Sequence, residues 1–212
     1  MNEVLKESVR LTGAGRTDAG CHARGQVASF TSETRLPARS LPPLLARRLP
    51  EDVQVRVARD VEHGFDARRS ARARRYAYRL LERGDVLLQR LAWHPRRALD
   101  AGRLEAAVRP LEGEHDCTAL AAAGGTAHTT CRVLRAGWRR WEGGLQLDLV
   151  ADHFLYHMVR NVVGTALAVM GRPDPAAAVA EIMASRSRAR GGATAPPQGL
   201  CLEQVFYDEE AR

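Results

Sequence analysis

The stretch RVLRAGWRRWEGGLQLDLVAD, residues 132–152, constrains the fold more than any other part of this chain. It consists of two runs rich in β-forming side chains, joined at the glycine pair Gly143–Gly144. Two such runs on either side of a glycine turn are typical of an antiparallel hairpin. The chain must therefore build an antiparallel sheet.

The other segments divide into strands and helices by the period of their apolar residues. We predict strands at 9–15, 25–32, 53–61, 73–82 and 200–207. We predict helices at 38–50, 98–113, 154–171 and 174–186, with Asp100 and Asp174 as N-caps. Strands linked mostly by hairpins, together with a few helices, indicate an α+β fold.

The composition is typical of a folded protein that binds an acidic partner. The 212 residues are 45% hydrophobic and 27% charged, and no window approaches the ~18 apolar residues of a membrane span. The N-terminus lacks the basic-then-apolar pattern of a secretory signal. The net charge of +7 favours nucleic acid as the partner. Nearly all the cations are arginines, a bias that a GC-rich genome would also produce.

The cysteines and histidines give no clear metal motif. The chain has four cysteines, Cys21, Cys117, Cys131 and Cys201. They stand far apart and form no CxxC pair, so we expect four independent, reduced thiols in a cytosolic protein. His153 and His157 have the i, i+4 spacing of two ligands on one helix face, but the sequence offers no HExxH motif and no evident third ligand. We therefore expect no metal site.

The glycine-rich stretch GAGRTDAGCHA, residues 13–23, carries a single acidic residue, Asp18. Its three glycines allow a tight loop and the close approach of a ligand. A lone carboxylate there can cap a helix, form an Asx-turn or act as a nucleophile, and the residues alone favour a structural role. The stretch does not match the phosphate-binding pattern GxxxxGK[ST], and Asp18 would repel a phosphate.

Five segments occur in an order that changes this interpretation. They are GRTDAGCHARGQV at 15–27, FDARRS at 65–70, RRYAY at 74–78, FLYHMVRNVVG at 154–164 and APPQGLCL at 195–202. Together they resemble the motifs of the tRNA pseudouridine synthase A family, and the resemblance extends over residues 9–207. It implies an isomerase that converts uridine to pseudouridine at positions 38–40 of the tRNA anticodon stem-loop. It also implies two ferredoxin-like (RRM-like) subdomains with mainly antiparallel sheets.

The resemblance implies a role for each site residue. Asp18 is the nucleophile that holds the sugar or the base while the glycosidic bond breaks, a task that suits a carboxylate. Arg160 is the cation that keeps Asp18 ionised. Tyr76 stacks on the flipped base, and Tyr78 is its rival on the same strand face. The implied substrate-binding residues are Arg16, Arg24, Arg68 and Leu200.

Several of these residues also fit a purely structural role. Without the resemblance, the two tyrosines are ordinary strand aromatics, and Leu200 is equally well a core residue. The arginines between 68 and 75 form a dense basic series that tRNA phosphates would neutralise, but a solvated surface has the same composition. We expect His22 and His157 to be structural or RNA-contacting. No step requires a metal or another cofactor.

The sequence departs from the family pattern at two places. Cys21 stands where the family usually has valine, a small change. The first strand and helix of the family, with their YDG…F.GWQ.Q pattern, have no counterpart here. We therefore expect residues 1–61 to form an N-terminal subdomain that is truncated at its start and carries the Asp18 loop, and residues 62–212 to form a complete C-terminal subdomain. A mis-assigned start or trimmed sequence is favoured over a short protein that dimerises or a decaying copy.

These observations predict a cytoplasmic homodimer that acts on tRNA and binds neither membrane nor DNA. One rival is an inactive remnant of the same family that binds tRNA in a salt-dependent way without isomerising uridine. The other is an unrelated hydrolase with an aspartate nucleophile. That hydrolase would need a second carboxylate within about 5–10 Å of Asp18.

Overall fold

The computed structural model describes residues 1–124 and 128–208, and its contacts divide the chain into two compact units. The smaller unit contains Met1–Gly15 and Val27–Ser70, and the larger unit contains Arg16–Gln26 and Ala71–Arg212. The Asp18 loop therefore groups with the larger unit. The predicted subdomain boundary between residues 61 and 62 stays a prediction. Among the described helices, none is long and apolar enough to cross a membrane.

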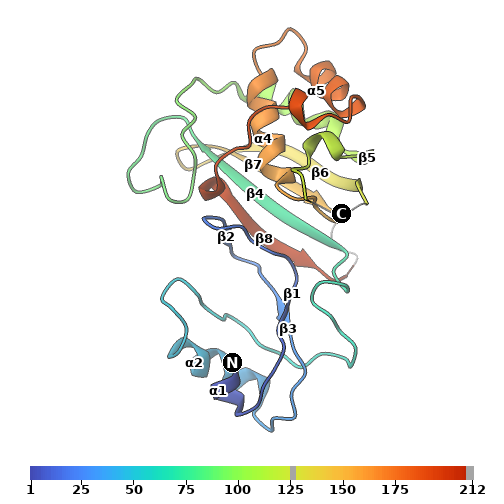
Figure 1. Ribbon diagram of the computed structural model, residues 1–212. Coiled ribbons are helices and arrows are strands. Elements are labelled where there is room, and N and C mark those ends of the chain that lie inside the picture. The colour runs from blue at the N-terminus through green and yellow to red at the C-terminus, as the bar shows by residue number, and fades with distance from the viewer. Residues whose placement is uncertain (125–127, 209–212) are drawn as a thin grey trace. The chain divides into compact units, whose positions relative to one another are not determined.

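The larger unit is built on a six-stranded sheet in the order β2-β8-β4-β7-β6-β5 (Figure 1). Its strands are β2 (His22–Ala23), β4 (Ala73–Leu81), β5 (Gly113–Asp116), β6 (Thr130–Trp141), β7 (Gly144–Ala151) and β8 (Leu200–Phe206). The short β2–β8 pair is parallel, and the other neighbouring pairs are antiparallel. A mainly antiparallel sheet with few helices confirms the α+β class.

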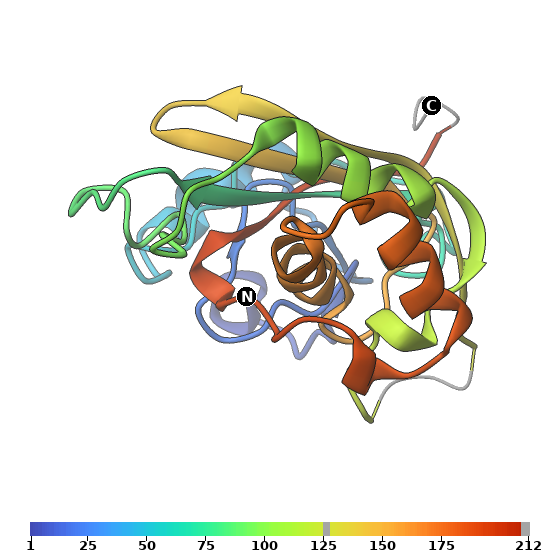
Figure 2. The same ribbon diagram turned by 90° about the horizontal axis from the view of Figure 1, so that it is seen from above.

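The helices α3 (Ala101–Val108), α4 (Met158–Val169) and α5 (Pro175–Ala184) lie on one face of this sheet (Figure 2). The 3-10 turns are η2 (Arg109–Leu111), η3 (Thr118–Leu120), η4 (Arg188–Arg190) and η5 (Pro197–Gly199). The Asp100 carboxylate accepts from the Arg103 amide, and the Asp174 carboxylate accepts from the Ala177 amide, each at 3.0 Å. Both predicted N-caps are confirmed, because each carboxylate satisfies an amide that the first helical turn leaves unpaired.

The two faces of the sheet differ in polarity. Tyr78 of β4 pairs in register with Leu147 of β7, and both side chains are fully buried on the apolar face. The opposite face carries ion pairs, such as Arg79 to Glu203 at 2.7 Å. This alternation follows from the period of two along each strand.

The predicted hairpin exists, but its turn lies one residue earlier than the glycine pair suggests. Glu142 and Gly143 connect β6 to β7, and Gly143 has a φ of 85°, which favours glycine. Gly144 already belongs to β7. A Cβ at Gly144 would lie 2.1 Å from the Leu80 carbonyl oxygen. The second glycine is therefore required for contact with β4.

The smaller unit has little regular structure. It contains α1 (Asn2–Leu5), β1 (Thr12–Gly13), β3 (Ala28–Ser29), η1 (Ala38–Ser40) and α2 (Leu41–Ala46). Its core is a cluster of Leu5, Leu41 and Leu45 with partly buried apolar neighbours. The strands predicted at 9–15 and 25–32 are reduced to the two-residue pair β1–β3.

The prediction of a strand at 53–61 is wrong. No strand is assigned to these residues in the described part of the chain. Val55 packs against the leucine cluster, whereas Val53, Val57 and Val61 are 49%, 76% and 51% exposed. Alternation indicates which side chains share a face, but a strand also needs a paired neighbour for its backbone groups.

Candidate active site

The Asp18 loop is fixed to the edge of the six-stranded sheet through β8. The amides of Arg24 and Gly25 both donate to the Leu202 carbonyl, at 2.8 and 3.1 Å. A Cβ at Gly25 would lie 2.3 Å from the Glu203 carbonyl oxygen, so only glycine allows this close approach. The backbone that carries Asp18 is thereby anchored to β8, the second strand from this edge of the sheet.

The Asp18 carboxylate lies beside two basic side chains. Its Oδ2 is 3.0 Å from His157 Nε2 and 3.6 Å from Arg160 Nη1. The Asp18 side chain is 25% exposed, so a ligand can reach it, while the partners are 21% and 13% exposed. Partial burial strengthens these interactions compared with a surface ion pair.

Both basic residues come from the start of α4. His157 is the N-cap and has a φ of 59°, a left-handed conformation that is uncommon for a residue with a side chain. Its ring stacks on Tyr156 at a centroid distance of 3.9 Å, and its carbonyl accepts from the Asn161 amide. Both basic side chains that contact Asp18 therefore come from the first turn of α4 or the residue just before it.

Arg160 is held from its other side by the segment before β8. Its Nε donates to the Ala195 carbonyl at 2.7 Å, and the Ala195 amide donates back to the Arg160 carbonyl at 3.1 Å. One edge of the guanidinium is therefore committed to the backbone. The Nη1 atom remains directed at Asp18.

The structure separates the two candidate tyrosines. The hydroxyl of Tyr78, which is fully buried, donates to the Pro196 carbonyl at 2.7 Å. Tyr76 is 9% exposed, and its ring meets Phe154 edge-on at 4.9 Å. Burial raises the pKa of Tyr76, and the nearby Asp18 carboxylate adds to that rise. Tyr78 therefore fixes the Pro196 segment, while Tyr76 lies in the electrostatic field of Asp18.

Leu200 begins β8 in register with Tyr78, and it is half-buried. The preceding Gly199 lies against the Tyr78 ring, because a Cβ there would come within 2.7 Å of two ring carbons. Gly20 of the Asp18 loop, with a φ of 81°, lies against Pro197, where a Cβ would come within 3.0 Å. The residues around Leu200 thus connect the Asp18 loop to β4.

The three arginines predicted to bind substrate lie on exposed surface. Arg16 and Arg24 belong to the Asp18 loop in the larger unit. Arg68 belongs to the smaller unit, where it lines a hollow of about 380 Å³. Its backbone amide donates to Asp66, and the amides of Arg68 and Arg69 lower the pKa of the Asp66 carboxyl.

All four cysteines are free thiols, as the sequence predicted. Two of them lie close together, and a hydrogen bond with Cys131 lowers the pKa of Cys117. The Cys131 Sγ is also 3.4 Å from His153 Nε2. His153 and His157 therefore serve different neighbours. Within residues 1–124 and 128–208, no group of three or more His, Cys, Asp or Glu side chains could hold a metal ion.

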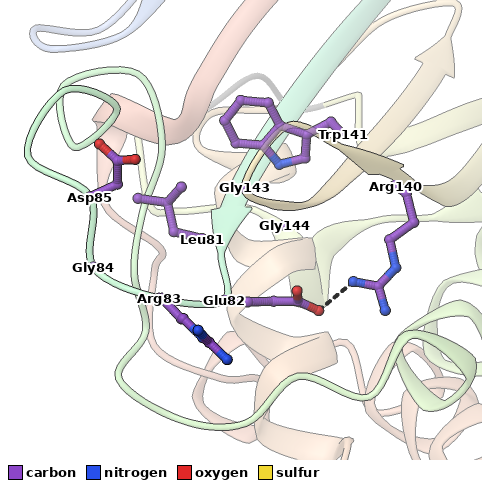
Figure 3. A pocket seen from close by; sticks show the side chains of 9 residues that line it. All are labelled: Leu81, Glu82, Arg83, Gly84, Asp85, Arg140, Trp141, Gly143 and Gly144. Carbon is purple, nitrogen blue, oxygen red and sulfur yellow. Dashed lines mark hydrogen bonds and ion pairs between the residues drawn. The ribbon is translucent and has the colours of Figure 1, made fainter.

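A hollow of about 400 Å³ lies at the turn of the β6–β7 hairpin (Figure 3). It is lined by Leu81, Glu82, Arg83, Gly84, Asp85, Arg140, Trp141, Gly143 and Gly144. An ion pair between Arg140 and Glu82 crosses one side of it. None of its lining residues is a predicted site residue.

The sequence did not predict that His157 would contact the Asp18 carboxylate. We expected it to be structural or RNA-contacting, yet it makes the shorter of the two contacts to Asp18. The available signal was its place directly before the helix that carries Arg160. The left-handed conformation that turns its ring toward Asp18 is not encoded by any simple pattern.

Comparisons with known proteins identify the class and then the family. The sequence model of the tRNA pseudouridine synthase family matches residues 107–208. A tRNA pseudouridine synthase A of Moorella thermoacetica is 40% identical over 97% of this chain and 87% of its own length. Proteins of the same description from Myxococcus xanthus and Methylococcus capsulatus are each 41% identical, over 98% and 99% of this chain and 80% and 79% of their own lengths.

These matches establish that the chain is an enzyme of the isomerase class, a pseudouridine synthase. It belongs to the tRNA pseudouridine synthase A family.

Proposed function

We propose that this enzyme converts uridine to pseudouridine at positions 38–40 of the tRNA anticodon stem-loop, with Asp18 as the nucleophile. The names of its relatives support tRNA as the substrate. The observation that carries the proposal is the Asp18 carboxylate at 3.0 Å from His157 and 3.6 Å from Arg160 at the start of α4. A partly exposed carboxylate with such partners is suited to nucleophilic catalysis.

The proposed isomerisation of uridine needs no second reactant, because the product contains the same atoms as the substrate. Asp18 adds either to the ribose at C1′ or to the uracil ring. In both routes the N1–C1′ bond breaks, the uracil turns, and a C5–C1′ bond forms. The proton leaves C5 and a proton is added at N1, so the product is an isomer of the substrate.

Each neighbour of Asp18 then has a task. Arg160 and His157 orient the carboxylate before attack and stabilise its negative charge when it leaves. Tyr76 stacks on the flipped base and assists proton removal at C5. Leu200 packs against the uracil ring.

The exposed arginines serve binding. Arg16 contacts the RNA backbone or helps to flip the base, and Arg24 and Arg68 neutralise tRNA phosphates. We further propose that the enzyme works as a cytoplasmic homodimer. The contacts of Asp18 favour this assignment over a two-carboxylate hydrolase, because the side chains placed on Asp18 are basic, whereas that mechanism needs a second acid.

The test uses tRNA with tritium at C5 of its uridines and compares wild type with Asp18→Asn. Tritium release follows the C5 proton directly, and chemical mapping locates the product. Asp60→Asn, at an exposed carboxylate in the smaller unit, is the matched control. We expect at least a 10³-fold loss of release for Asp18→Asn and a wild-type rate for Asp60→Asn.

The outcomes separate the proposal from its rivals. Product at positions 38–40 from wild type alone supports it. Tight binding of tRNA without release in any variant supports an inactive binding protein. Product at other positions keeps the chemistry and overturns the proposed site on tRNA.

A further inference from the structure

We propose that Arg188 is a positioning residue for the reaction, and that it fixes residues 191–195 against α4 so that Ala195 orients Arg160 toward Asp18. The proposal rests on the function proposed above. It assigns a role in catalysis to the arginine-rich segment 185–199, which the sequence indicated only as a loop.

Arg188 is the centre of a polar network on α4. Its Nη2 shares two hydrogens among three acceptors, which are Asn161 Oδ1 at 2.9 Å, the Gly192 carbonyl at 2.6 Å and Thr194 Oγ1 at 3.2 Å. Thr194 Oγ1 in turn donates to Asn161 Oδ1 at 2.7 Å. One guanidinium therefore connects Gly192 and Thr194 of segment 191–195 to one side chain of α4.

Asn161 is a rigid anchor for this network. Its side chain is completely buried, and its Nδ2 donates to the Leu120 carbonyl at 2.8 Å. A buried amide with all its groups satisfied holds one orientation. Asn161 also follows Arg160 directly in α4, so the anchor and the residue to be positioned share one turn of helix.

Segment 191–195 lies along α4 at very short range. The Gly192 amide donates to Thr165 Oγ1 at 3.1 Å. A Cβ at Gly164 would lie 1.7 Å from the Ala193 carbonyl oxygen, and a Cβ at Gly192 would lie 2.1 Å from the Gly164 carbonyl oxygen. This close packing leaves the segment little room to shift while the Arg188 contacts hold.

The network ends at Arg160. The segment places the Ala195 carbonyl 2.7 Å from Arg160 Nε, and this contact determines how the guanidinium is turned. The contact of Nη1 to Asp18 is 3.6 Å, so a modest rotation of the guanidinium would lose it. Arg188 thus acts on the reacting carboxylate through Arg160 without contacting it.

The test compares Arg188→Gln with Arg190→Gln in the full chain. Both substitutions remove one arginine from η4, but Arg190 is exposed and serves as the matched control. For Arg188→Gln we expect kcat to fall between about tenfold and a hundredfold, the range of a misplaced catalytic group. We expect the KM for tRNA and the salt dependence of binding to stay within about twofold of wild type. Arg190→Gln should keep the wild-type kcat.

Chemical rescue provides a sharper readout. Arg188→Ala leaves a gap of guanidinium shape, so millimolar guanidinium should restore part of its kcat and should leave Arg190→Ala unchanged. A weaker KM with a reduced salt slope and unchanged kcat would show that Arg188 contacts RNA and would overturn the proposal. A kcat equal to that of Arg190→Gln would also overturn it.

A second measurement does not depend on activity. The Nε–H of Arg160, assigned in ¹⁵N spectra through Arg160→Lys, should be protected from solvent exchange in wild type. Arg188→Gln, and the milder Thr194→Val at an exposed position, should each reduce that protection severalfold. Unchanged protection would refute the positioning role, whereas protection without isomerisation by wild type would refute the proposed function alone.

Discussion

At the residue scale, the most informative side chain is His157. It contacts Asp18, and its backbone adopts a left-handed conformation at the start of α4. Backbone strain of this kind costs about 1–3 kcal/mol and is found where a function maintains it. The contact therefore indicates that the orientation of the carboxylate is controlled from two directions.

We expect His157→Asn to lower kcat by about tenfold to a hundredfold. Asparagine tolerates the left-handed conformation but is too short to reach Asp18. Loss of a hydrogen bond to a charged group costs about 1.5–3 kcal/mol. Single-turnover rates on tRNA measure the effect. His63→Asn, at an exposed histidine of the smaller unit, is the control, and equal rates for the two variants would contradict the assigned role.

Tyr76 makes a prediction about alkaline stability. Burial raises the pKa of Tyr76 in the folded state, while the unfolded chain ionises near pH 10. The unfolded state therefore loses its proton first, and the free energy of unfolding falls as the pH rises above about 10. Tyr76→Phe removes this contribution, so its stability should fall less steeply, by up to about 1.4 kcal/mol per pH unit.

Urea unfolding at several pH values between about 8 and 11 checks this slope. Tyr156→Phe, at a tyrosine that is 46% exposed, should keep the wild-type slope. If Tyr76→Phe also keeps it, Tyr76 is not held neutral by the fold.

The sequence predicted the identity of several site residues better than their geometry. Asp18 and Arg160 come from a resemblance to a family, and the structure brings them within 3.6 Å. The sequence could not distinguish the role of Tyr76 from that of Tyr78, because both are tyrosines on the same face of one strand. Only the Tyr78 hydrogen bond to Pro196, which depends on tertiary structure, distinguishes them.

At the element scale, the start of α4 supplies the two basic side chains that contact Asp18. Substitution of Gly164 in this helix tests how α4 is packed. Gly164→Ala would place a Cβ 1.7 Å from the Ala193 carbonyl oxygen. We expect a loss of about 2 kcal/mol or more in the free energy of unfolding, because a backbone contact cannot rotate away. Gly171→Ala, where a Cβ would meet no atom within 4 Å, is the control. Equal melting temperatures for the two variants would refute the close packing of segment 191–195.

Helices and strands were predictable where a pattern in the sequence coincided with a packing or pairing partner in the fold. The helices α3 and α5 begin at carboxylate caps that can be read from the sequence. The segment 53–61 has the alternation of a strand but no ladder partner, and no strand is assigned to it. The sequence did not predict the pairing of β2 with β8, because a strand of two residues is too short to show a period.

At the scale of the whole molecule, the net charge of +7 predicts binding that depends strongly on salt. We expect the logarithm of the tRNA association constant to fall linearly with the logarithm of the salt concentration. Arg24→Gln and Arg68→Gln, one in each unit, should each reduce the slope by about 1. Arg24→Lys keeps the charge and should keep the slope, so a reduced slope for Arg24→Lys would mean that the contact is not electrostatic.

The path of the chain around the Asp18 loop has a consequence for how such proteins can change. The chain leaves the smaller unit after Gly15 and returns at Val27, and the Ala14 amide donates to the Val27 carbonyl at this point. Residues 16–26 are thus an inserted segment whose two ends lie next to each other. Its side chains and backbone contact β8 and α4, so we expect its substitutions to be constrained by those two elements more than by its immediate chain neighbours. Distance along the polypeptide is therefore a poor guide to which substitutions must occur together.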